Sequence, residues 1–245
     1  MWRLCQVLLL LILSFSSAQT DPLRSQIVGG HEAKPHSRPY MAYLEDPEGY
    51  ICGGFLVAPQ WVMTAAHCNR TYRVILGAHN TRLNETSQQV FTVKGNYEHP
   101  YYYIDKKSAS NDIRLLKLDS KATLNGYVQI LRLPQSERDL SHGTPCSVAG
   151  WGLVCKDWAP DTLFETNVAI YDHRQCRDLY PNLDDEQVCA GRPGEPANSS
   201  MGDSGGPLVC NGVAEGIVSY GNPCPPAVYT RVGHYLPWIK KTMKL

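Results

Sequence analysis

Short runs of apolar residues, broken by glycine, proline and asparagine, recur along most of the chain. Clear examples are Tyr50–Val57, Tyr72–Gly77 and Ile113–Leu118. The same pattern returns from Thr144 to Val232, and such runs predict antiparallel strands. Only the last segment, His234–Leu245, has apolar residues at helical spacing. We therefore expect an all-β protein, with two barrels, a crevice between them and a C-terminal helix.

The first residues have the pattern of a secretory signal peptide. A basic residue, Arg3, precedes the apolar run Val7–Leu13 and the small residues Ser16–Ala18. This run is too short to span a bilayer, so we expect residues 1–18 to be removed by cleavage after Ala18. The mature protein is then expected to be secreted or stored in a vesicle, where disulfides persist.

The cysteine content agrees with that compartment. The chain has 9 cysteines, and the loss of Cys5 with the signal peptide leaves an even number. An even number is typical of a fully paired disulfide framework. Histidines and cysteines lack the spacing of a zinc site, so we expect no metal and no cofactor. The formal net charge of +0 does not favour nucleic-acid binding, and no later segment is apolar enough to anchor the chain in a membrane.

One short segment, Gly202–Pro207, has the sequence Gly-Asp-Ser-Gly-Gly-Pro. Glycines on both sides of Ser204 predict a hydroxyl exposed in a tight turn. The N–H groups of Gly202 and Ser204 are candidates to stabilise an oxyanion, usually the largest electrostatic contribution in acyl transfer. A serine nucleophile also needs a histidine base and a carboxylate that orients the base. By itself, the segment is equally consistent with a Gly/Ser-rich surface turn.

A histidine and an aspartate in the first half of the chain are candidates for those two roles. His67 follows small residues in Thr-Ala-Ala-His-Cys, and Asp112 directly precedes the apolar run that begins at Ile113. Each has an ordinary alternative, namely a structural histidine and a solvated turn aspartate. The chain order His67, Asp112, Ser204 matches one of the known orders of a Ser–His–Asp triad.

The segment Ile27–Gly30 has the sequence Ile-Val-Gly-Gly. It is either an ordinary turn that opens a strand or a new N-terminus made by cutting before Ile27. The second interpretation gives Asp203 a role, because a free α-amino group on Ile27 can pair with its carboxylate. Burying one charge of such a pair without its partner is costly. The uncut chain lacks the α-amino group, so we expect it to be inactive.

Together these segments resemble a known family. Over the whole mature chain, residues 27–245, the sequence resembles the chymotrypsin-fold serine proteases. The shared motifs, in the family's order, are Ile-Val-Gly-Gly, Thr-Ala-Ala-His-Cys, Asn-Asp-Ile, Gly-Trp-Gly at 150–152, Gly-Asp-Ser-Gly-Gly-Pro, and Ser-Tyr-Gly at 219–221. The resemblance implies two antiparallel six-stranded, trypsin-like barrels with the active site in the cleft between them. The implied limits are an activation propeptide at 19–26, barrel one at about 27–130, barrel two at about 131–233 and a helix at 234–245.

The resemblance also implies a role for each matching residue. Ser204 is the nucleophile, His67 transfers its proton and Asp112 orients His67. The amides of Gly202 and Ser204 form the oxyanion hole. Ser219 hydrogen-bonds near Asp112.

The specificity pocket is expected to be neutral. The residues implied to contact the substrate are Asn198, Ser199, Ser219, Tyr220, Gly221 and Ala227. The segment 219–221 pairs with the substrate backbone like an added strand. At the implied floor, Asn198 is not acidic, which disfavours trypsin-like cleavage after arginine or lysine. Gly221 leaves one wall open, and Ala227 lacks the arginine that gives granzyme B its preference for aspartate, so we expect cleavage after large apolar or aromatic residues.

Three disulfides follow from the resemblance. They are Cys52–Cys68, Cys146–Cys210 and Cys176–Cys189. Cys155 and Cys224 are left over. In most of the family, the cysteine in the loop of Cys224 is bonded to a cysteine four residues before the catalytic serine, but in this chain that position is Ser200. Both leftover loops are expected to border the specificity pocket, so we predict a fourth bond between Cys155 and Cys224. The alternative is two free thiols.

Within the family, segments 31–44, 76–80 and 238–244 are similar to those of granzymes and mast-cell chymases. This branch implies storage in secretory granules, a monomer, and protein or peptide substrates. Serpin-type inhibitors and acidic proteoglycan are candidate partners. Sequons at Asn69 and Asn84 predict N-glycosylation, whereas the loop after Gly77 offers too few hard oxygen ligands for calcium.

A hypothesis from a different class competes with the enzyme. Some granule relatives keep the protease fold but have lost catalysis and act by binding. Such a homologue usually has a replaced histidine, serine or glycine in these motifs, and this chain has none of those replacements. The sequence therefore favours an active endopeptidase.

Overall fold

Strand β11 (Phe164–Ile170) illustrates why this sequence forms sheets. Phe164, Thr166, Val168 and Ile170 are buried, while the intervening side chains are partly or fully exposed. Because successive side chains of a strand point to opposite faces, this alternation places one face of β11 in the core. The computed structural model describes residues 30–105, 108–152, 160–192, 203–221 and 226–244.

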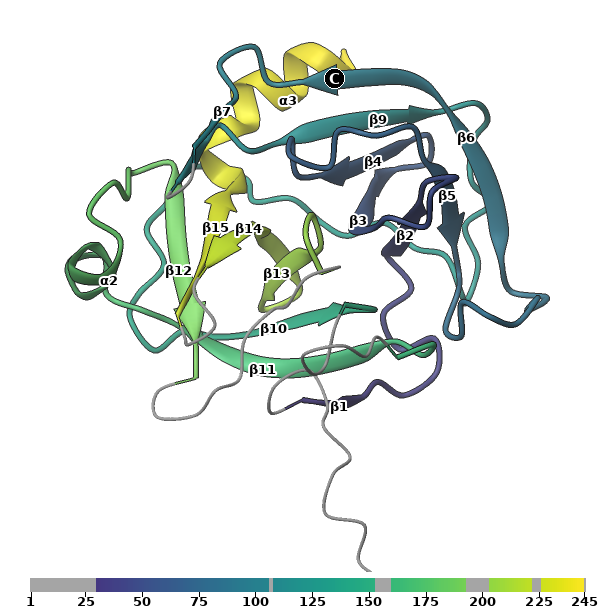
Figure 1. Cartoon of the computed structure of the whole chain (residues 1–245), viewed down its shortest axis with the longest axis horizontal. Helices are drawn as coiled ribbons and strands as arrows, with labels where there is room; N and C mark the ends of the chain where they lie inside the picture. The colour runs from purple at the N-terminus through teal and green to yellow at the C-terminus, as the bar shows by residue number, and fades with distance from the viewer. Residues whose placement is uncertain (1–29, 106–107, 153–159, 193–202, 222–225, 245) are drawn as a thin grey trace, which may run out of the picture.

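The first half of the chain closes into one antiparallel barrel (Figure 1). Its strands are β2 (Met41–Glu45), β3 (Ile51–Ala58), β4 (Trp61–Thr64), β5 (Arg73–Leu76), β6 (Gln89–Glu98) and β9 (Arg114–Leu118), in the order β2-β3-β4-β9-β6-β5. The three apolar runs predicted as strands correspond to β3, β5 and β9, so these predictions are confirmed.

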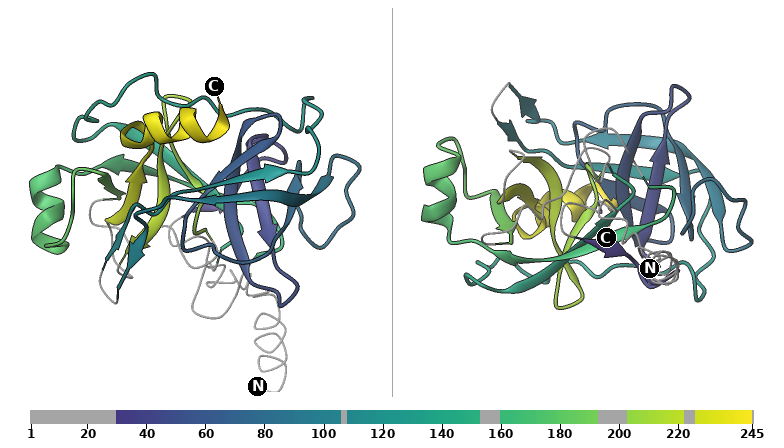
Figure 2. Two further views of the ribbon diagram at one scale, coloured as in Figure 1. Left: turned by 90° about the horizontal axis from the view of Figure 1, so that it is seen from above. Right: turned by 60° about the horizontal axis from the view of Figure 1, so that its bottom comes forward.

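The second half forms a second barrel beside the first (Figure 2). Its strands are β10 (Pro145–Gly150), β11, β12 (Gln187–Gly191), β13 (Pro207–Cys210), β14 (Val213–Gly221) and β15 (Ala227–Arg231). They follow the order β11-β10-β13-β14-β15-β12, and a pairing between β11 and β12 closes the ring. The predicted fold of two six-stranded antiparallel barrels is confirmed. A further short strand, β1 (His31–Glu32), pairs with the first two residues of β11, Phe164 and Glu165.

The C-terminal helix is confirmed, with slightly different limits. A 3-10 turn, η1 (Val232–Tyr235), leads into α3 (Leu236–Met243). The helix α2 (His173–Leu179) was not predicted from the spacing of apolar residues. The Asp172 side chain caps α2 by accepting from two backbone N–H groups. Cys176 is the one buried residue of α2, so the segment has no apolar stripe from which a helix is predicted.

Each barrel encloses its own apolar core. Leu44, Phe55, Met63 and Leu115 are fully buried in the first barrel, and Tyr229 is fully buried in the second. The structure contains the disulfides Cys52–Cys68, Cys146–Cys210 and Cys176–Cys189. Cys155 and Cys224 lie outside the described residues, so their bond stays a prediction. None of the helices within the described ranges is long and apolar enough to cross a membrane.

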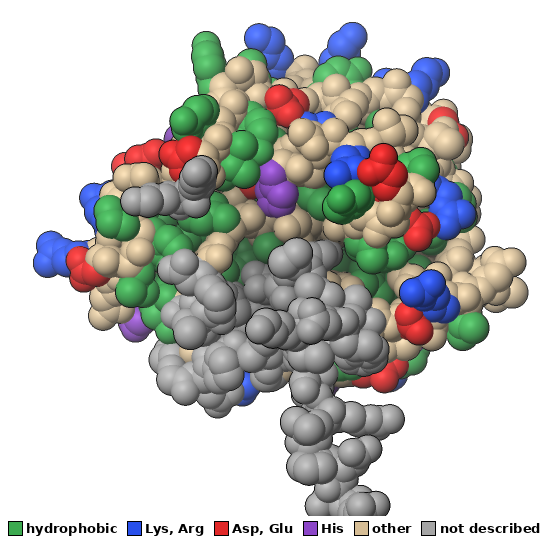
Figure 3. Space-filling model, in the orientation of Figure 1, with side chains coloured by type: hydrophobic (Ala, Val, Ile, Leu, Met, Phe, Trp, Pro, Cys, Tyr) green, Lys and Arg blue, Asp and Glu red, His purple; other side chains and the backbone are tan. Residues whose placement is uncertain are grey.

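A hairpin of β7 (Tyr103–Ile104) and β8 (Ala109–Ser110) projects from the first barrel. Tyr101, Tyr103 and Ile104 expose 76%, 62% and 53% of their surface. Figure 3 shows hydrophobic side chains gathered at the upper left, where Figure 1 places this hairpin. The hairpin therefore presents an apolar edge to solvent.

Candidate active site

His67 lies in a turn directly after β4. Ala65 and Ala66 are fully buried, and the N–H of Cys68 donates to the carbonyl of Ala65 at 3.2 Å. The disulfide between Cys68 and Cys52 ties this turn to β3. The small side chains therefore let the turn pack tightly and present the His67 imidazole, whose side chain is 22% exposed, toward solvent.

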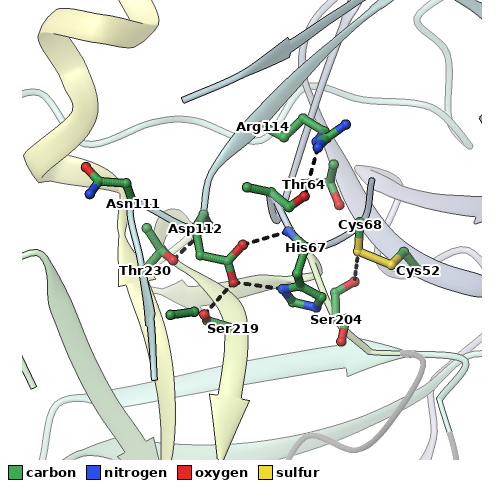
Figure 4. Close-up of polar contacts among 12 residues, drawn as sticks. Cys52, Thr64, His67, Cys68, Asn111, Asp112, Arg114, Ser204, Ser219 and Thr230 are labelled. Carbon is green, nitrogen blue, oxygen red and sulfur yellow. Dashed lines mark hydrogen bonds and ion pairs between the residues drawn. A yellow bond between two sulfur atoms is a disulfide. The ribbon is translucent and has the colours of Figure 1, made fainter. Parts of the chain in front are cut away.

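Asp112 contacts His67 twice. His67 Nδ1 lies 2.7 Å from Asp112 Oδ2, and the backbone N–H of His67 donates to Asp112 Oδ1 at 2.9 Å. An ionised carboxylate can only accept hydrogen bonds, so the His67 proton is placed on Nδ1. In this tautomer Nε2, on the side of the ring away from Asp112, carries no proton and can accept one. Figure 4 shows Ser204 beside the imidazole.

The second barrel supplies two further hydrogen bonds to Asp112 (Figure 4). The Ser219 hydroxyl donates to Asp112 Oδ2 at 2.5 Å, and the Thr230 hydroxyl donates to the Asp112 carbonyl at 2.9 Å. All three residues are buried. Asp112 is therefore held from both barrels.

The charge of Asp112 is stabilised by these donors. Burial by itself raises the pKa of the Asp112 carboxyl, but hydrogen bonds from His67 and Ser219 lower it below its ordinary value. The residue is therefore an anion at neutral pH, which is the state that orients and stabilises an imidazolium.

The turn that carries Ser204 is packed between the barrels. Gly205 has a φ of +82°, and a Cβ there would lie 2.1 Å from Thr64 Oγ1. Only glycine fits both conditions. The carbonyl of Ser204 accepts from the N–H of Gly53 at 2.8 Å, which anchors the turn to β3 close to the Cys52–Cys68 disulfide. The fold thus brings Ser204 next to the segment that carries His67.

Asp203 is buried rather than exposed, with 2% of its surface accessible. The N–H of Gly152 donates to Asp203 Oδ1 at 2.9 Å. A Cβ at Gly150 would lie 2.0 Å from the same oxygen, so the Gly-Trp-Gly segment leaves room for this carboxylate. The partner predicted from sequence, Ile27, lies outside the described residues.

A cleft of about 490 Å³ leads away from His67. It is lined on one side by Ile104, Asp105, Ser108 and Ala109, and on the other by Leu179, Tyr180, Pro181, Asn182, Ser219, Tyr220 and Gly221. The segment predicted to pair with substrate, 219–221, therefore borders this cleft. A larger hollow, of about 670 Å³, lies between the segment around Asp139 and α2 and contains none of the predicted catalytic or substrate-contacting residues.

Gly221 and Ala227 face each other across β14 and β15. They are paired in register, and a Cβ at Gly221 would lie 3.3 Å from the Ala227 Cβ. Both are thus on one side of the sheet, as the predicted pocket walls require. Asn198, Ser199 and Gly202, which was predicted to contribute to an oxyanion hole, lie outside the described residues.

Two contributors to this region, Tyr180 and Glu186, were not predicted from the sequence. The Tyr180 hydroxyl donates to the Pro226 carbonyl at 2.8 Å and its ring packs edge-on against Tyr220. Glu186 accepts from the Asn111 N–H at 2.8 Å and from the Tyr235 hydroxyl at 2.6 Å, next to Asp112. These contacts join segments far apart in the sequence, and no local motif marks them.

The predicted glycosylation sites, Asn69 and Asn84, are both exposed. Glu85, inside the second sequon, accepts from the backbone N–H groups of His79 and Asn80 at 2.7 and 3.2 Å. Across the described ranges, no group of three or more histidine, cysteine or acidic side chains is arranged to hold a metal ion.

Comparisons with known proteins place this chain in a family. The chain matches the protein-family model described as "Trypsin" over residues 27–239. It is 46% identical to granzyme H of Homo sapiens over 246 residues, covering 97% of this chain and 98% of the relative. It is 47% identical to granzyme B of Rattus norvegicus, with coverage of 97% and 98%. It is 44% identical to cathepsin G of Mus musculus, with coverage of 96% and 92%.

Solved structures give the same result. The structure of GrC superposes with a TM-score of 0.82 and 42% identity, covering 89% of this chain and 99% of that chain. Neuropsin, a serine protease of mouse brain, gives a TM-score of 0.81 and 39% identity, with coverage of 88% and 99%. The protein therefore belongs to the trypsin family of serine proteases, in the branch that contains the granzymes, cathepsin G and mast-cell proteases.

Proposed function

We propose that this protein is a serine endopeptidase that hydrolyses peptide bonds through an acyl-enzyme, with Ser204, His67 and Asp112 as its triad. The observation that carries the proposal is the double contact between His67 and Asp112, which places the proton on Nδ1 and leaves Nε2 to accept one. In this mechanism Nε2 takes the proton of the Ser204 hydroxyl as it attacks the substrate carbonyl. The imidazolium then returns the proton to the leaving amine. Water next attacks the acyl-enzyme ester by the same steps, again with His67 as the base.

The charge on the tetrahedral intermediate needs hydrogen-bond donors. We assign this role to the backbone N–H groups of Gly202 and Ser204. The N–H of Gly206 donates to the Asp203 carbonyl at 2.9 Å, which supports the assignment because that carbonyl belongs to the peptide that carries the Ser204 N–H. The neighbouring strand segment, Ser219–Gly221, would hold the substrate backbone alongside the cleft.

Activation is proposed to follow cleavage before Ile27. The new α-amino group would pair with the Asp203 carboxylate, which is buried directly before the nucleophile. A cation beside a buried carboxylate would offset part of the free energy that burying its charge costs. We further propose that residues 1–18 direct the chain to secretion or storage in secretory granules and that 19–26 are the propeptide.

The proposed preference is for large apolar or aromatic residues at the cleaved position. Gly221 has no side chain, and its partner across β14 and β15, Ala227, has only a methyl group, so neither proposed wall would narrow the pocket. The floor is assigned to Asn198 by the sequence resemblance. Proteins and peptides are the proposed substrates, and serpin-type inhibitors and acidic proteoglycan are candidate partners.

A cleavage-site profile on a diverse peptide library tests these proposals. The chain cut before Ile27 is compared with the same chain carrying Ser204→Ala. We expect cleavage after aromatic or large aliphatic residues, reduced by several orders of magnitude in the variant. Cleavage after arginine or aspartate would refute the pocket assignment but keep the triad. Equal inactivity of both folded proteins would refute the enzyme and favour a binding protein.

A further inference from the structure

Arg114 is a buried cation close to His67, and the proposed catalytic mechanism does not use it. It is the first residue of β9, and 5% of its side chain is exposed. Its neighbours along the chain, Ile113, Leu115 and Leu116, are apolar and buried. Arginine is rarely buried unless its guanidinium is paired, so the partners of this side chain indicate what it does.

The partners come from the segment before His67 and from strand β6. Arg114 Nη2 donates to the carbonyl oxygen of Ala66 at 2.9 Å, and Nη1 donates to Asn96 Oδ1 at 3.0 Å. Nη2 also forms an ion pair with the Glu98 carboxylate. Arg114 lies directly opposite Thr64 on β4 and Glu98 on β6, so the strand register brings these groups together.

The carbonyl group of Ala66 and the N–H group of His67 belong to the same peptide unit. Its oxygen accepts from Arg114, and its N–H, which is that of His67, donates to Asp112 Oδ1 at 2.9 Å. A peptide unit is planar, so hydrogen bonds at its two ends fix its orientation. The position of the His67 Cα, and with it the aim of the imidazole, then depends on Arg114 as well as on Asp112.

We propose that Arg114 is a positioning residue for His67, and that Glu98 balances its charge so that a buried cation can lie beside the Ala66–His67 peptide. The proposal rests on the proposed function, in which His67 is the general base. Arg114 acts through the Ala66–His67 peptide and does not contact the reacting atoms.

The charges around Arg114 lie on several elements. Glu98 faces it from β6, Tyr102 from the segment before β7 and Tyr72 from the segment before β5, while Asp112 faces His67. Burial raises the pKa of Tyr102 to about 12; the Asp112 and Glu98 carboxylates also raise it and Arg114 lowers it, so all three charges act on one phenol. A change in either Arg114 or Glu98 is therefore expected to reach the Asp112–His67 pair.

Two substitutions separate position from charge. Arg114→Met removes both the donor to Ala66 and the cation, whereas Glu98→Gln removes only the carboxylate and keeps an acceptor for Arg114. We expect Arg114→Met to lower kcat about tenfold with little change in KM, because His67 loses its alignment. Glu98→Gln is expected to keep kcat within about twofold at a pH where His67 is neutral.

The His67 pKa gives a readout that a purely structural role would not move in this way. It is measured by NMR in the full chain carrying Ser204→Ala, and independently as the acid limb of kcat/KM in the active enzyme. Arg114→Met leaves the Glu98 anion unbalanced, so the His67 pKa should rise by about half a pH unit. Glu98→Gln leaves the Arg114 cation unbalanced, so the pKa should fall by a similar amount. Arg114→Lys keeps the charge and should stay near the wild-type pKa.

Opposite shifts of the His67 pKa in the two variants support the proposal. Shifts in the same direction, or an unchanged pKa with unchanged kcat, overturn it. If Arg114→Met does not fold, Glu98→Gln decides the question, because an unchanged His67 pKa in that variant is also contrary to the proposal. The two proposals fail in different ways. A wild-type chain that shows no Ser204-dependent cleavage would refute the proposed function. The NMR measurement needs no activity, so it would still decide whether Arg114 affects His67.

Discussion

The Thr230 hydroxyl donates a hydrogen bond of 2.9 Å to the main-chain carbonyl oxygen of Asp112. Thr230 lies on β15 in the second barrel, whereas Asp112 lies just before β9 in the first. Both residues are buried. This bond therefore joins the two barrels at the residue whose side chain contacts His67.

Replacing Thr230 by valine tests the importance of this bond. Thr230→Val keeps the shape of the side chain but leaves a buried carbonyl without this donor. A buried polar group that loses its partner costs about 1–3 kcal/mol, so we expect a decrease of that size in the free energy of unfolding. Urea denaturation measures the decrease, and kcat is expected to fall several-fold as Asp112 loses one of its anchors.

The matched control is Thr92→Val. Thr92 is exposed, and its hydroxyl donates to Asp119 at 2.7 Å on the surface of β6. Solvent can replace that bond, so the loss of stability should be below about 1 kcal/mol. Equal losses in the two variants would show that the link between the barrels contributes nothing beyond an ordinary surface bond.

The depressed pKa of Asp112 makes stability depend on acid pH. Burial opposes the charge, but the donors His67 and Ser219 lower the pKa below its ordinary value in the folded state. A carboxylate whose pKa is lower in the folded than in the unfolded state stabilises the protein at pH values above the unfolded pKa of about 4. This stabilisation is lost as the pH falls through the pKa of the folded state. Asp112→Asn removes the titrating group, so the variant should lose less stability than wild type between about pH 6 and about pH 2.

Unfolding by urea at several pH values measures this difference. Asp178→Asn, which changes an exposed carboxylate on α2, serves as the control and should follow the wild-type pH dependence. A pH dependence of Asp112→Asn identical to that of wild type would mean that the Asp112 charge does not contribute to folding stability in acid.

The strands and the main catalytic candidates were predictable because their signals are local. Runs such as Ile113–Leu118 carry strand periodicity, and the segments around His67 and Ser204 are short motifs. The spatial link from Asp112 to Ser219 followed from the resemblance, and the structure brings the two together at 2.5 Å. Pairing of the barrel strands agrees with the same resemblance.

The supporting residues were not predictable, because their roles depend on register and long-range contact. Arg114 looks like a solvent-facing position inside an apolar run, and only the pairing with Glu98 reveals its burial. Tyr180 lies at the end of a helix without an apolar stripe. Glu186 contacts Asn111, 75 positions earlier in the chain.

Gly152 is predicted to be essential for the arrangement around Asp203. A Cβ at this position would lie 2.6 Å from Asp203 Oδ1 and 2.7 Å from its backbone nitrogen. Both distances are too short for a carbon contact, so Gly152→Ala must displace the residue that precedes Ser204. We expect kcat/KM to fall by about 100-fold or more, because a displacement near 1 Å already has effects of this size on catalysis.

Gly126→Ala is the control for this substitution, because a Cβ at Gly126 meets nothing within 4 Å. It should leave both activity and stability close to wild type. Titration with an irreversible serine-directed phosphonate, together with the unfolding free energy, separates a displaced nucleophile from a protein that has lost its fold. A fully active Gly152→Ala enzyme would show that Asp203 can move without disturbing Ser204, and would argue against the coupling on which the proposed activation depends.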